Sequence, residues 1–352
     1  MQPWIMVTIC ICLSPGCGGT PISDGVDSRR ADAGTYPVDA DVCECSFEDP
    51  LSPGHFQRTH FTKGPMSLAY GGHIRYCWDI ETLVGGGCEE ERFDFHVRII
   101  NAGFDIHPYN ADRGWGCGWR DLLADEEHIT ITNQTICLNP RDLEQEKLSN
   151  PECDCPPVRP LMERVIRVER SATLGSNQFG QVSARCKEDS VLINGGCSLI
   201  GPYTAGWKER TLSRSGFSPG LTDSWQCAWN NPSEYADVML ATAICLEPPD
   251  YGPDLARGRI VRASHQQVLS SGEATTFTAS CEPGDLLIGG SCMIDSNDPL
   301  SHQITMFYYG VDSFEDGNHD RTTSNTWRCA WHNPSTSNPM ATATAICVTP
   351  LQ

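Results

Sequence analysis

The sequence predicts an all-β protein built from three tandem small disulfide-bonded β-sandwich domains, each of roughly 85 residues. The first observation behind this prediction is that four cysteines recur three times at nearly fixed spacing. The second is that the residues around them repeat, and the third is that short β runs and turns separate them. The three sets are Cys77, Cys88, Cys117 and Cys137; Cys186, Cys197, Cys227 and Cys245; and Cys281, Cys292, Cys329 and Cys347.

Short sequence motifs around the cysteines, which we call words, are shared between the repeats. The second cysteine ends TLVGGGC, LINGGC and LIGGSC, and the third lies in GWGCGW, SWQCAWNNP and TWRCAWHNP. The fourth lies in QTICLNP, ATAICLEP and TATAICVTP. In the WxCxW word, both tryptophans and the cysteine lie on one face of a strand, because side chains alternate along a strand. Indoles packed over a disulfide are the favoured interpretation, and an exposed aromatic platform is the alternative.

Alternating and β-branched runs predict six strands in each of the last two repeats. In the second repeat these runs are 164–170, 181–186, 190–194, 207–213, 224–230 and 238–246. In the third repeat they are 259–264, 275–281, 285–289, 303–310, 326–332 and 340–348.

The words GGC, WxCxW and AxAIC together resemble a small β domain of exported bacterial proteins and phage tail proteins. The resemblance covers residues 60–140, 165–247 and 260–349 and is strongest in the second and third repeats. The first repeat lacks the Asn-Pro after its WxCxW word and the two alanines before Cys137. This domain type has no settled activity, so the resemblance implies a fold and a compartment only.

Hairpin register argues against disulfides between cysteines that are neighbours in sequence. A turn at EPGD after Cys281 would leave Cys292 about 20 Å away, and a turn near Thr336 would leave Cys347 about 13 Å from the residue opposite Cys329. Both gaps exceed the Cα limit of roughly 7 Å for a disulfide. Two connectivities remain, and we favour first-to-fourth with second-to-third because first and fourth cysteines lie near strand ends. The expected pairs are Cys77–Cys137, Cys88–Cys117, Cys186–Cys245, Cys197–Cys227, Cys281–Cys347 and Cys292–Cys329.

The first 16 residues resemble an export signal that is followed by a lipidated cysteine. The apolar run 4–13 is too short to span a bilayer but fits the apolar core of a signal peptide. Gly16 and Cys17 match the end of a bacterial lipoprotein signal, whereas Ser14, Pro15 and the missing basic residue depart from it. We expect a lipid at Cys17 that anchors the protein in the outer membrane of the cell envelope. The alternative is an ordinary cleaved signal and a secreted protein.

Cysteine parity supports lipidation of Cys17. Cleavage before Cys17 removes two of the 19 cysteines, and lipidation then leaves an even number for disulfides. Besides the twelve repeat cysteines, these are Cys43, Cys45, Cys153 and Cys155. Two disulfides are favoured for that group over a four-thiolate zinc site.

The remaining chain divides into a tether, three repeats and two linkers. Residues 17–54 are rich in Gly, Pro and Asp and are expected to be a disordered tether. The repeats are expected at 55–140, 161–249 and 259–352, with linkers at 141–160 and 250–258. The net charge of −20, with no basic stripe, excludes nucleic acid as a partner.

No motif predicts an enzyme, a metal site or a cofactor. The word GFSPG at 216–220 matches a nucleophile elbow, but Pro219 follows the serine and has no N–H for an oxyanion. Asp316, Asn318 and Asp320 have calcium-loop spacing without the turn glycine and the closing glutamate. A solvated acidic loop is favoured there.

The segments between second and third cysteines differ most among the repeats, with 28, 29 and 36 residues. Divergent loops on a shared scaffold are where binding usually lies. We therefore expect a surface binding or adhesion module whose glycan or protein ligand contacts these segments. A structural envelope or spacer protein is the alternative. The candidate ligand-binding residues are Tyr109, Tyr203, Trp207, Tyr308 and Tyr309.

Overall fold

The structure is a computed structural model. It describes residues 56–66, 70–78, 81–90, 97–104, 114–121, 129–139, 161–200, 210–248, 258–295, 300, 303–312 and 324–350. In these residues the chain forms antiparallel strands and one four-residue helix, α2 (Leu161–Arg164). The all-β prediction is therefore confirmed.

Each repeat contributes six strands. The first repeat forms β1 (Phe56–Met66), β2 (Tyr70–Tyr76), β3 (Thr82–Glu90), β4 (Val97–Phe104), β5 (Gly114–Asp121) and β6 (Ile129–Leu138). The second forms β7 (Val165–Leu174), β8 (Gln178–Arg185), β9 (Val191–Ile200), β10 (Thr211–Phe217), β11 (Ser224–Asn231) and β12 (Asp237–Leu246). The third forms β13 (Ile260–Val268), β14 (Ala274–Ser280), β15 (Leu286–Ile294), β16 (Thr305–Val311), β17 (Thr326–His332) and β18 (Met340–Val348).

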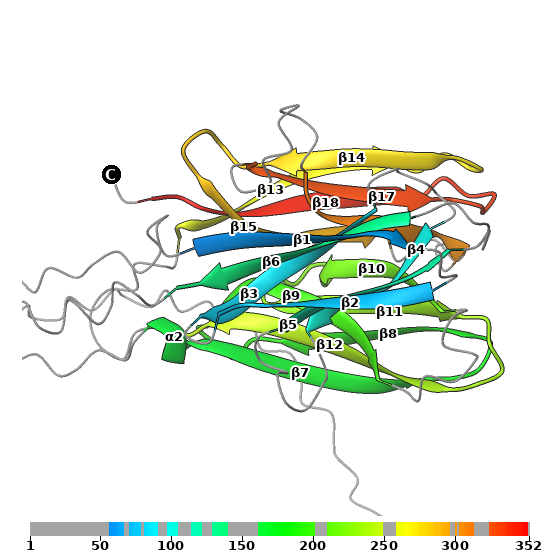
Figure 1. Ribbon diagram of the computed structural model, residues 1–352, viewed down its shortest axis with the longest axis horizontal. Coiled ribbons are helices and arrows are strands. Elements are labelled where there is room, and N and C mark those ends of the chain that lie inside the picture. The colour runs from blue at the N-terminus through cyan, green and yellow to red at the C-terminus, as the bar shows by residue number, and fades with distance from the viewer. Residues whose placement is uncertain are drawn as a thin grey trace, which may run out of the picture. The chain divides into compact units, whose positions relative to one another are not determined.

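Each sheet is shared by two repeats (Figure 1). The three six-stranded sheets have the orders β1-β6-β3-β16-β17-β14, β2-β5-β4-β9-β12-β7 and β13-β18-β15-β10-β11-β8. The first, third and sixth strands of one repeat form one half of a sheet, and the second, fourth and fifth strands of another repeat form the other half. Every repeat is thus a sandwich of two half-sheets, and each half-sheet continues into a neighbour. The three repeats consequently close into a ring.

The ring is joined at three equivalent places, which we call seams. At each seam the third strand of one repeat pairs with the fourth strand of another. The pairs in register are Ala102 with Cys197, Ser215 with Cys292, and Tyr309 with Cys88. At each seam the second cysteine of one repeat therefore pairs with a residue of a neighbour's fourth strand, and this residue occupies an equivalent position in all three fourth strands. The three fourth strands also contact one another around the centre of the ring.

The disulfides join the two half-sheets within each repeat. They have the expected first-to-fourth and second-to-third pairing, with Cα–Cα distances between 5.6 and 5.8 Å. Each closes a loop of 29 to 66 residues, which the loop-entropy estimate equates to about 4 kcal/mol of stability. Since a repeat of this size buries a thin core, these crosslinks are a large part of its stability.

The hairpins used to infer this pairing do not exist. The strands on either side of EPGD, β14 and β15, lie in different sheets, and so do β17 and β18 on either side of Thr336. These connections cross from one face of the sandwich to the other. The paired cysteines therefore face each other across the sandwich.

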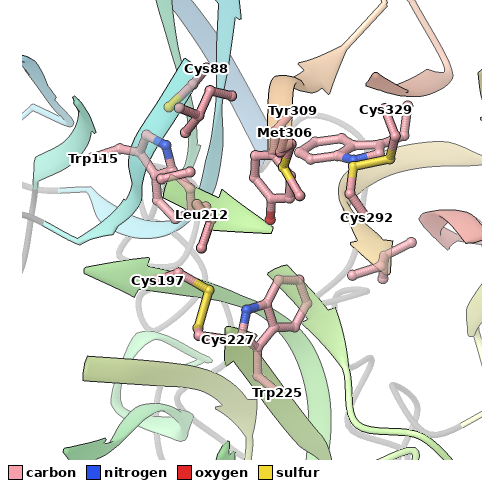
Figure 2. Packing of buried hydrophobic residues seen from close by; sticks show 14 of the residues in the cluster. Cys88, Trp115, Cys197, Leu212, Trp225, Cys227, Cys292, Met306, Tyr309 and Cys329 are labelled. Atoms are coloured by element: carbon pink, nitrogen blue, oxygen red, sulfur yellow. A yellow bond between two sulfur atoms is a disulfide. The ribbon is translucent and has the colours of Figure 1, made fainter. Parts of the chain in front are cut away.

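The tryptophans of the WxCxW words fill the space between the half-sheets. All six are at most 2% exposed. The glycine two residues before the second cysteine, which we call the middle glycine, lies against the first tryptophan of the WxCxW word. A Cβ on Gly86, Gly195 or Gly290 would come within 2.5 Å of an indole carbon. The second tryptophan reaches across a seam: Trp229 Nε1 donates to Ile100 O at 2.9 Å. Figure 2 shows two of the first tryptophans, Trp115 near Cys88 and Trp225 beside the Cys197–Cys227 disulfide, with Tyr309 between Trp115 and the Cys292–Cys329 disulfide.

One side chain, that of Asn194, fills a point where all three repeats meet. Its Nδ2 donates to Ile288 O of the third repeat at 3.4 Å, and its Oδ1 accepts the Gly195 N–H at 2.9 Å. The equivalent residues are Gly85 and Gly289, each three positions before the second cysteine. A Cβ on Gly85 would lie 1.7 Å from Asn194 Nδ2, and one on Gly289 would lie 2.3 Å from it. The centre therefore has room for the side chain of one of these three equivalent residues, and the other two are glycines.

We predict that repeat 3 stays bound after the second linker is cut. A protease site placed within residues 250–258 would separate the chain into two fragments that no disulfide of the described residues connects. Because two seams join repeat 3 to the rest, the cut protein should elute at the mass of the intact chain in size-exclusion chromatography with light scattering. Separation of the fragments without denaturant would contradict the ring.

We also predict that Gly85→Ala destabilises the protein only while Asn194 is present. Overpacking of this kind costs about 1–3 kcal/mol. In the Asn194→Gly background the clash is gone, so the same alanine should cost much less. Guanidinium unfolding of the two single variants and the double variant gives the coupling energy. Additive effects would show that the two positions do not share one space.

Candidate binding loops

The segment between second and third cysteines is not one loop, because a buried strand divides it. The strand is β4, β10 or β16, and at each seam it pairs with a third strand. Two connections remain in each repeat. We call the connections after the fourth strand, 105–113, 218–223 and 312–325, the entry loops. The connections before it, 91–96, 201–210 and 295–304, are the far loops.

The entry loops leave the ring at one common end, which is the end where the first strand of each repeat begins. Arg262 is two residues into β13 and donates to Thr222 O in the entry loop of repeat 2 at 2.8 Å. Arg58, two residues into β1, donates to Ser324 O in the entry loop of repeat 3. Since the three seams are equivalent, the fourth strands run in the same sense, and the strand ends that the far loops join lie at the opposite end. At each end the chain thus has three connections of different sequence.

Two of the proposed ligand-binding residues are core residues. Tyr308 and Tyr309 are fully buried in β16. The Tyr309 hydroxyl donates to Gly290 O at 3.1 Å, and its ring packs edge-on against Trp327. Burial raises the pKa of Tyr309, which stays a neutral donor. The prediction that these two tyrosines contact a ligand is therefore wrong, because the strand that carries them is at the centre of the ring.

Other sequence predictions concern parts of the chain outside the described residues. These are the remaining ligand-binding candidates Tyr109, Tyr203 and Trp207, the calcium-like loop with Asp316, Asn318 and Asp320, and the cysteines Cys17, Cys43, Cys45, Cys153 and Cys155. Tyr109 falls in an entry loop, whereas Tyr203 and Trp207 fall in a far loop.

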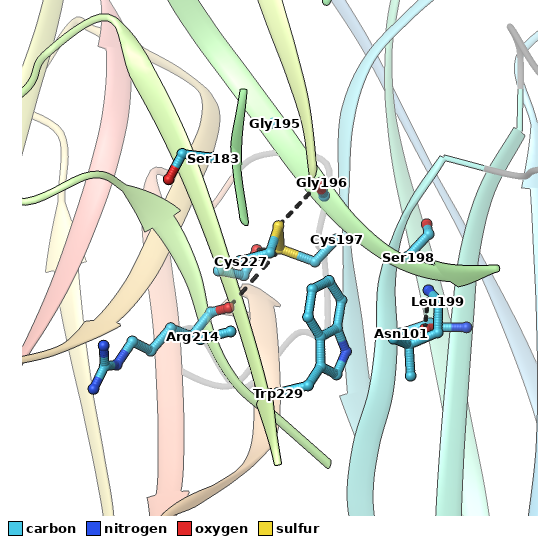
Figure 3. The surroundings of a disulfide bond; sticks show 12 residues. Asn101, Ser183, Gly195, Gly196, Cys197, Ser198, Leu199, Arg214, Cys227 and Trp229 are labelled. Carbon is cyan, nitrogen blue, oxygen red and sulfur yellow. Dashed lines mark hydrogen bonds between the residues drawn. A yellow bond between two sulfur atoms is a disulfide. The ribbon is translucent and has the colours of Figure 1, made fainter. Parts of the chain in front are cut away.

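The six tryptophans of the WxCxW words form no exposed platform. Trp229 lies beside the Cys197–Cys227 disulfide (Figure 3) and has no exposed surface. In the same view the Leu199 N–H donates to Asn101 Oδ1 at 3.0 Å across the seam between repeats 1 and 2. The interpretation of the indoles as packing residues is confirmed.

The entry loop of repeat 2 is a tight turn. The Leu221 N–H donates to Ser218 O at 3.0 Å, and Gly220 between them has a φ of 74°, which glycine adopts without strain. The Ser218 N–H closes the base of the loop on Ser224 O at 2.8 Å. The Ser218 hydroxyl contacts the hydroxyls of Ser183 and Ser224, so it is a structural group of the turn. Leu221 is 42% exposed at the tip.

Tyr235 is an exposed aromatic residue that the sequence analysis missed. It is 48% exposed and lies between β11 and β12 at the far end. Its carbonyl oxygen accepts hydrogen bonds from Asn231 Nδ2 at 2.8 Å, Ser233 Oγ at 3.2 Å and Arg210 Nη2 at 3.3 Å. Arg210 in turn forms a buried ion pair with Asp237 at 3.0 Å. The loop is therefore rigid while the ring of Tyr235 faces solvent.

The Asn-Pro-Ser word after WxCxW is the signal that marks this loop. Repeat 3 builds the same loop with Asn333 and Ser335, and Asn333 Nδ2 donates to Ser337 O at 2.8 Å. Ser337 occupies the place of Tyr235. The scaffold is thus shared, and the exposed side chain differs.

Metal and small-molecule sites find no support in the described residues. Cys77, Glu81 and Cys137 are the one group there with metal-ligand spacing, but the two cysteines form a disulfide and offer no thiolate. A cavity next to Trp119 and Phe307 has about 10 Å³, the space of a single water. Among the described tryptophans, Trp78 has the largest exposed fraction, 66%, and it follows Cys77 at the entry end.

No protein-family model matches the chain, and no curated protein matches its sequence. In the described residues no helix is both long and apolar enough for a membrane span. The six disulfides indicate an extracytoplasmic protein.

Proposed function

We propose that this protein is a surface binding or adhesion module that holds a glycan or protein ligand through its far loops. The supporting observation is the ring itself, which gathers three loops of different sequence at each end of a disulfide-bonded scaffold. Simultaneous contacts of several loops with one ligand raise affinity without any strong single site. Aromatic side chains such as Tyr235 supply rigid contact area on such surfaces.

The far end is favoured because the chain enters the ring at the entry end. Phe56, Val165 and Ile260 all begin their repeats there. A tether attached through residue 55 and anchored at Cys17 leaves the far end free to meet a ligand. We therefore propose that Tyr203, Trp207 and Tyr235 contact the ligand and that Tyr109 does not.

A structural spacer of the envelope is the second candidate function. The disulfides and the seams crosslink the described part of the ring, and the cavity near Trp119, with about 10 Å³, has the space of a single water. A spacer would need the ring and the tether but no specific loop sequence.

The binding proposal predicts that the fragment of residues 40–352, which contains the compact unit 45–352, retains a defined ligand on a glycan array or in a pull-down with purified surface proteins. Tyr235→Ser should weaken retention by roughly tenfold, as expected for loss of an aromatic contact. The loop should stay folded, because repeat 3 has serine at this place. Tyr203→Ala with Trp207→Ala should act likewise, and Tyr109→Ala is the matched control. Retention of nothing on either screen would favour the spacer.

Anchoring predicts a lipidated mature N-terminus at Cys17 when the full chain is expressed in a bacterial host. Mass spectrometry should find diacylglycerol on Cys17 and no residue before it. The Cys17→Ser variant should lose the lipid and leave the membrane fraction. An unmodified N-terminus beyond residue 17 would rule the anchor out.

A further inference from the structure

The first strand of every repeat carries an arginine at the same place. Arg58, Arg167 and Arg262 are each two residues after the start of the strand. Each is paired in register with the isoleucine before the fourth cysteine of its own repeat. The side chain of each arginine, however, contacts a different repeat.

Arg262 shows the contact in full. It belongs to repeat 3, but one Nη donates to Leu192 O at 3.2 Å and to Thr222 O at 2.8 Å, both in repeat 2. Its guanidinium carbon lies 4.3 Å from the centre of the Phe217 ring, also in repeat 2. Phe217 ends β10, and Thr222 lies in the loop that follows it. One side chain of repeat 3 thus holds both sides of the entry loop of repeat 2.

Arg58 repeats this contact at the seam that closes the ring. It belongs to repeat 1 and donates to Leu287 O and Ser324 O of repeat 3, the positions that correspond to Leu192 and Thr222. Burial lowers the pKa of Arg58 to about 10, so the side chain is a cation at neutral pH. Arg167 of repeat 2 lies over Phe104 of repeat 1 with its guanidinium carbon 5.1 Å from the ring centre.

We propose that these three arginines are positioning residues that fix the base of the entry loop of the preceding repeat, so that each loop base is held by two repeats. The arrangement makes each entry loop depend on the first strand of one neighbouring repeat. A ligand or a mutation that shifts the first strand of one repeat then alters the loop of another. This inference goes beyond the proposed function, because it concerns the entry loops and not the far loops that are proposed to contact a ligand.

The chemistry of the contact requires arginine. The planar guanidinium can stack on a phenyl ring while its edge donates to carbonyl oxygens. A lysine ammonium is a point charge without a flat face, and it cannot make both contacts together. Arg262→Lys should therefore behave like Arg262→Met.

Amide hydrogen exchange in residues 40–352 tests the proposal without any ligand. Two equivalent hydrogen bonds close the loop bases: Ser218 N–H to Ser224 O in repeat 2, and Asp312 N–H to Thr326 O in repeat 3, both at 2.8 Å. Arg262→Met should speed exchange at Ser218 by roughly tenfold and leave Asp312 unchanged. Arg58→Met should do the reverse.

Arg185→Met is the matched control. Arg185 pairs with Asp223 in the same loop at 2.7 Å, but it belongs to repeat 2, and its side chain is 63% exposed. This variant should leave the Ser218 exchange rate within about twofold, as expected for an exposed ion pair. Equal effects of Arg262→Met and Arg185→Met, exchange that rises at both loop bases together, or rescue by Arg262→Lys would each overturn the proposal. Should Arg262→Met fail to fold, Arg262→Lys gives the same comparison. Because the readout needs no ligand, its failure leaves the binding test untouched.

Discussion

The pairing of a third strand with a neighbour's fourth strand is the constraint on which the whole structure depends. A repeat on its own would expose two unpaired strand edges, at β9 and β10 in repeat 2, and such edges carry unsatisfied backbone groups. The seams cover these edges, and the third seam closes the ring because it pairs β16 of repeat 3 with β3 of repeat 1. The indole of Trp229 adds a hydrogen bond across a seam, to Ile100 O. The fold is therefore a property of all three repeats together.

The centre of the ring shows why these three repeats differ in sequence near the axis. Positions near the axis meet their own equivalents, so a large side chain in one repeat requires small ones in the others. Asn194 is matched by Gly85 and Gly289, and the buried Tyr309 by Ala102 and Ser215. Close packing leaves no room for a second copy of either large side chain. Packing thus explains the divergence at these positions.

The sequence was sufficient for the class but not for the sheets, and the disulfide pairing was predicted correctly from hairpins that the structure does not contain. Cysteine spacing and the GGC and WxCxW words report contacts inside one repeat. The sequence signal for the pairing of strands from different repeats is weaker. It is a small or aromatic residue followed by glycine in each fourth strand: Ala102-Gly103, Ser215-Gly216 and Tyr309-Gly310. That signal is hard to see because the distance to the third cysteine varies with the entry loop. For the same reason Tyr308 and Tyr309 read as loop residues although they lie in a central strand.

The residues that the repeats share are almost entirely used by the scaffold. The cysteines, the tryptophans and the middle glycines are buried against one another, and Asn231 and Asn333 hold loops by the same hydrogen bonds. At the surface the repeats differ in exposed side chains that are carried by the same backbone structure. An example is Tyr235, whose equivalent in repeat 3 is Ser337. A search for function in such a protein should therefore begin with positions whose backbone is equivalent in the repeats and whose exposed side chain is not.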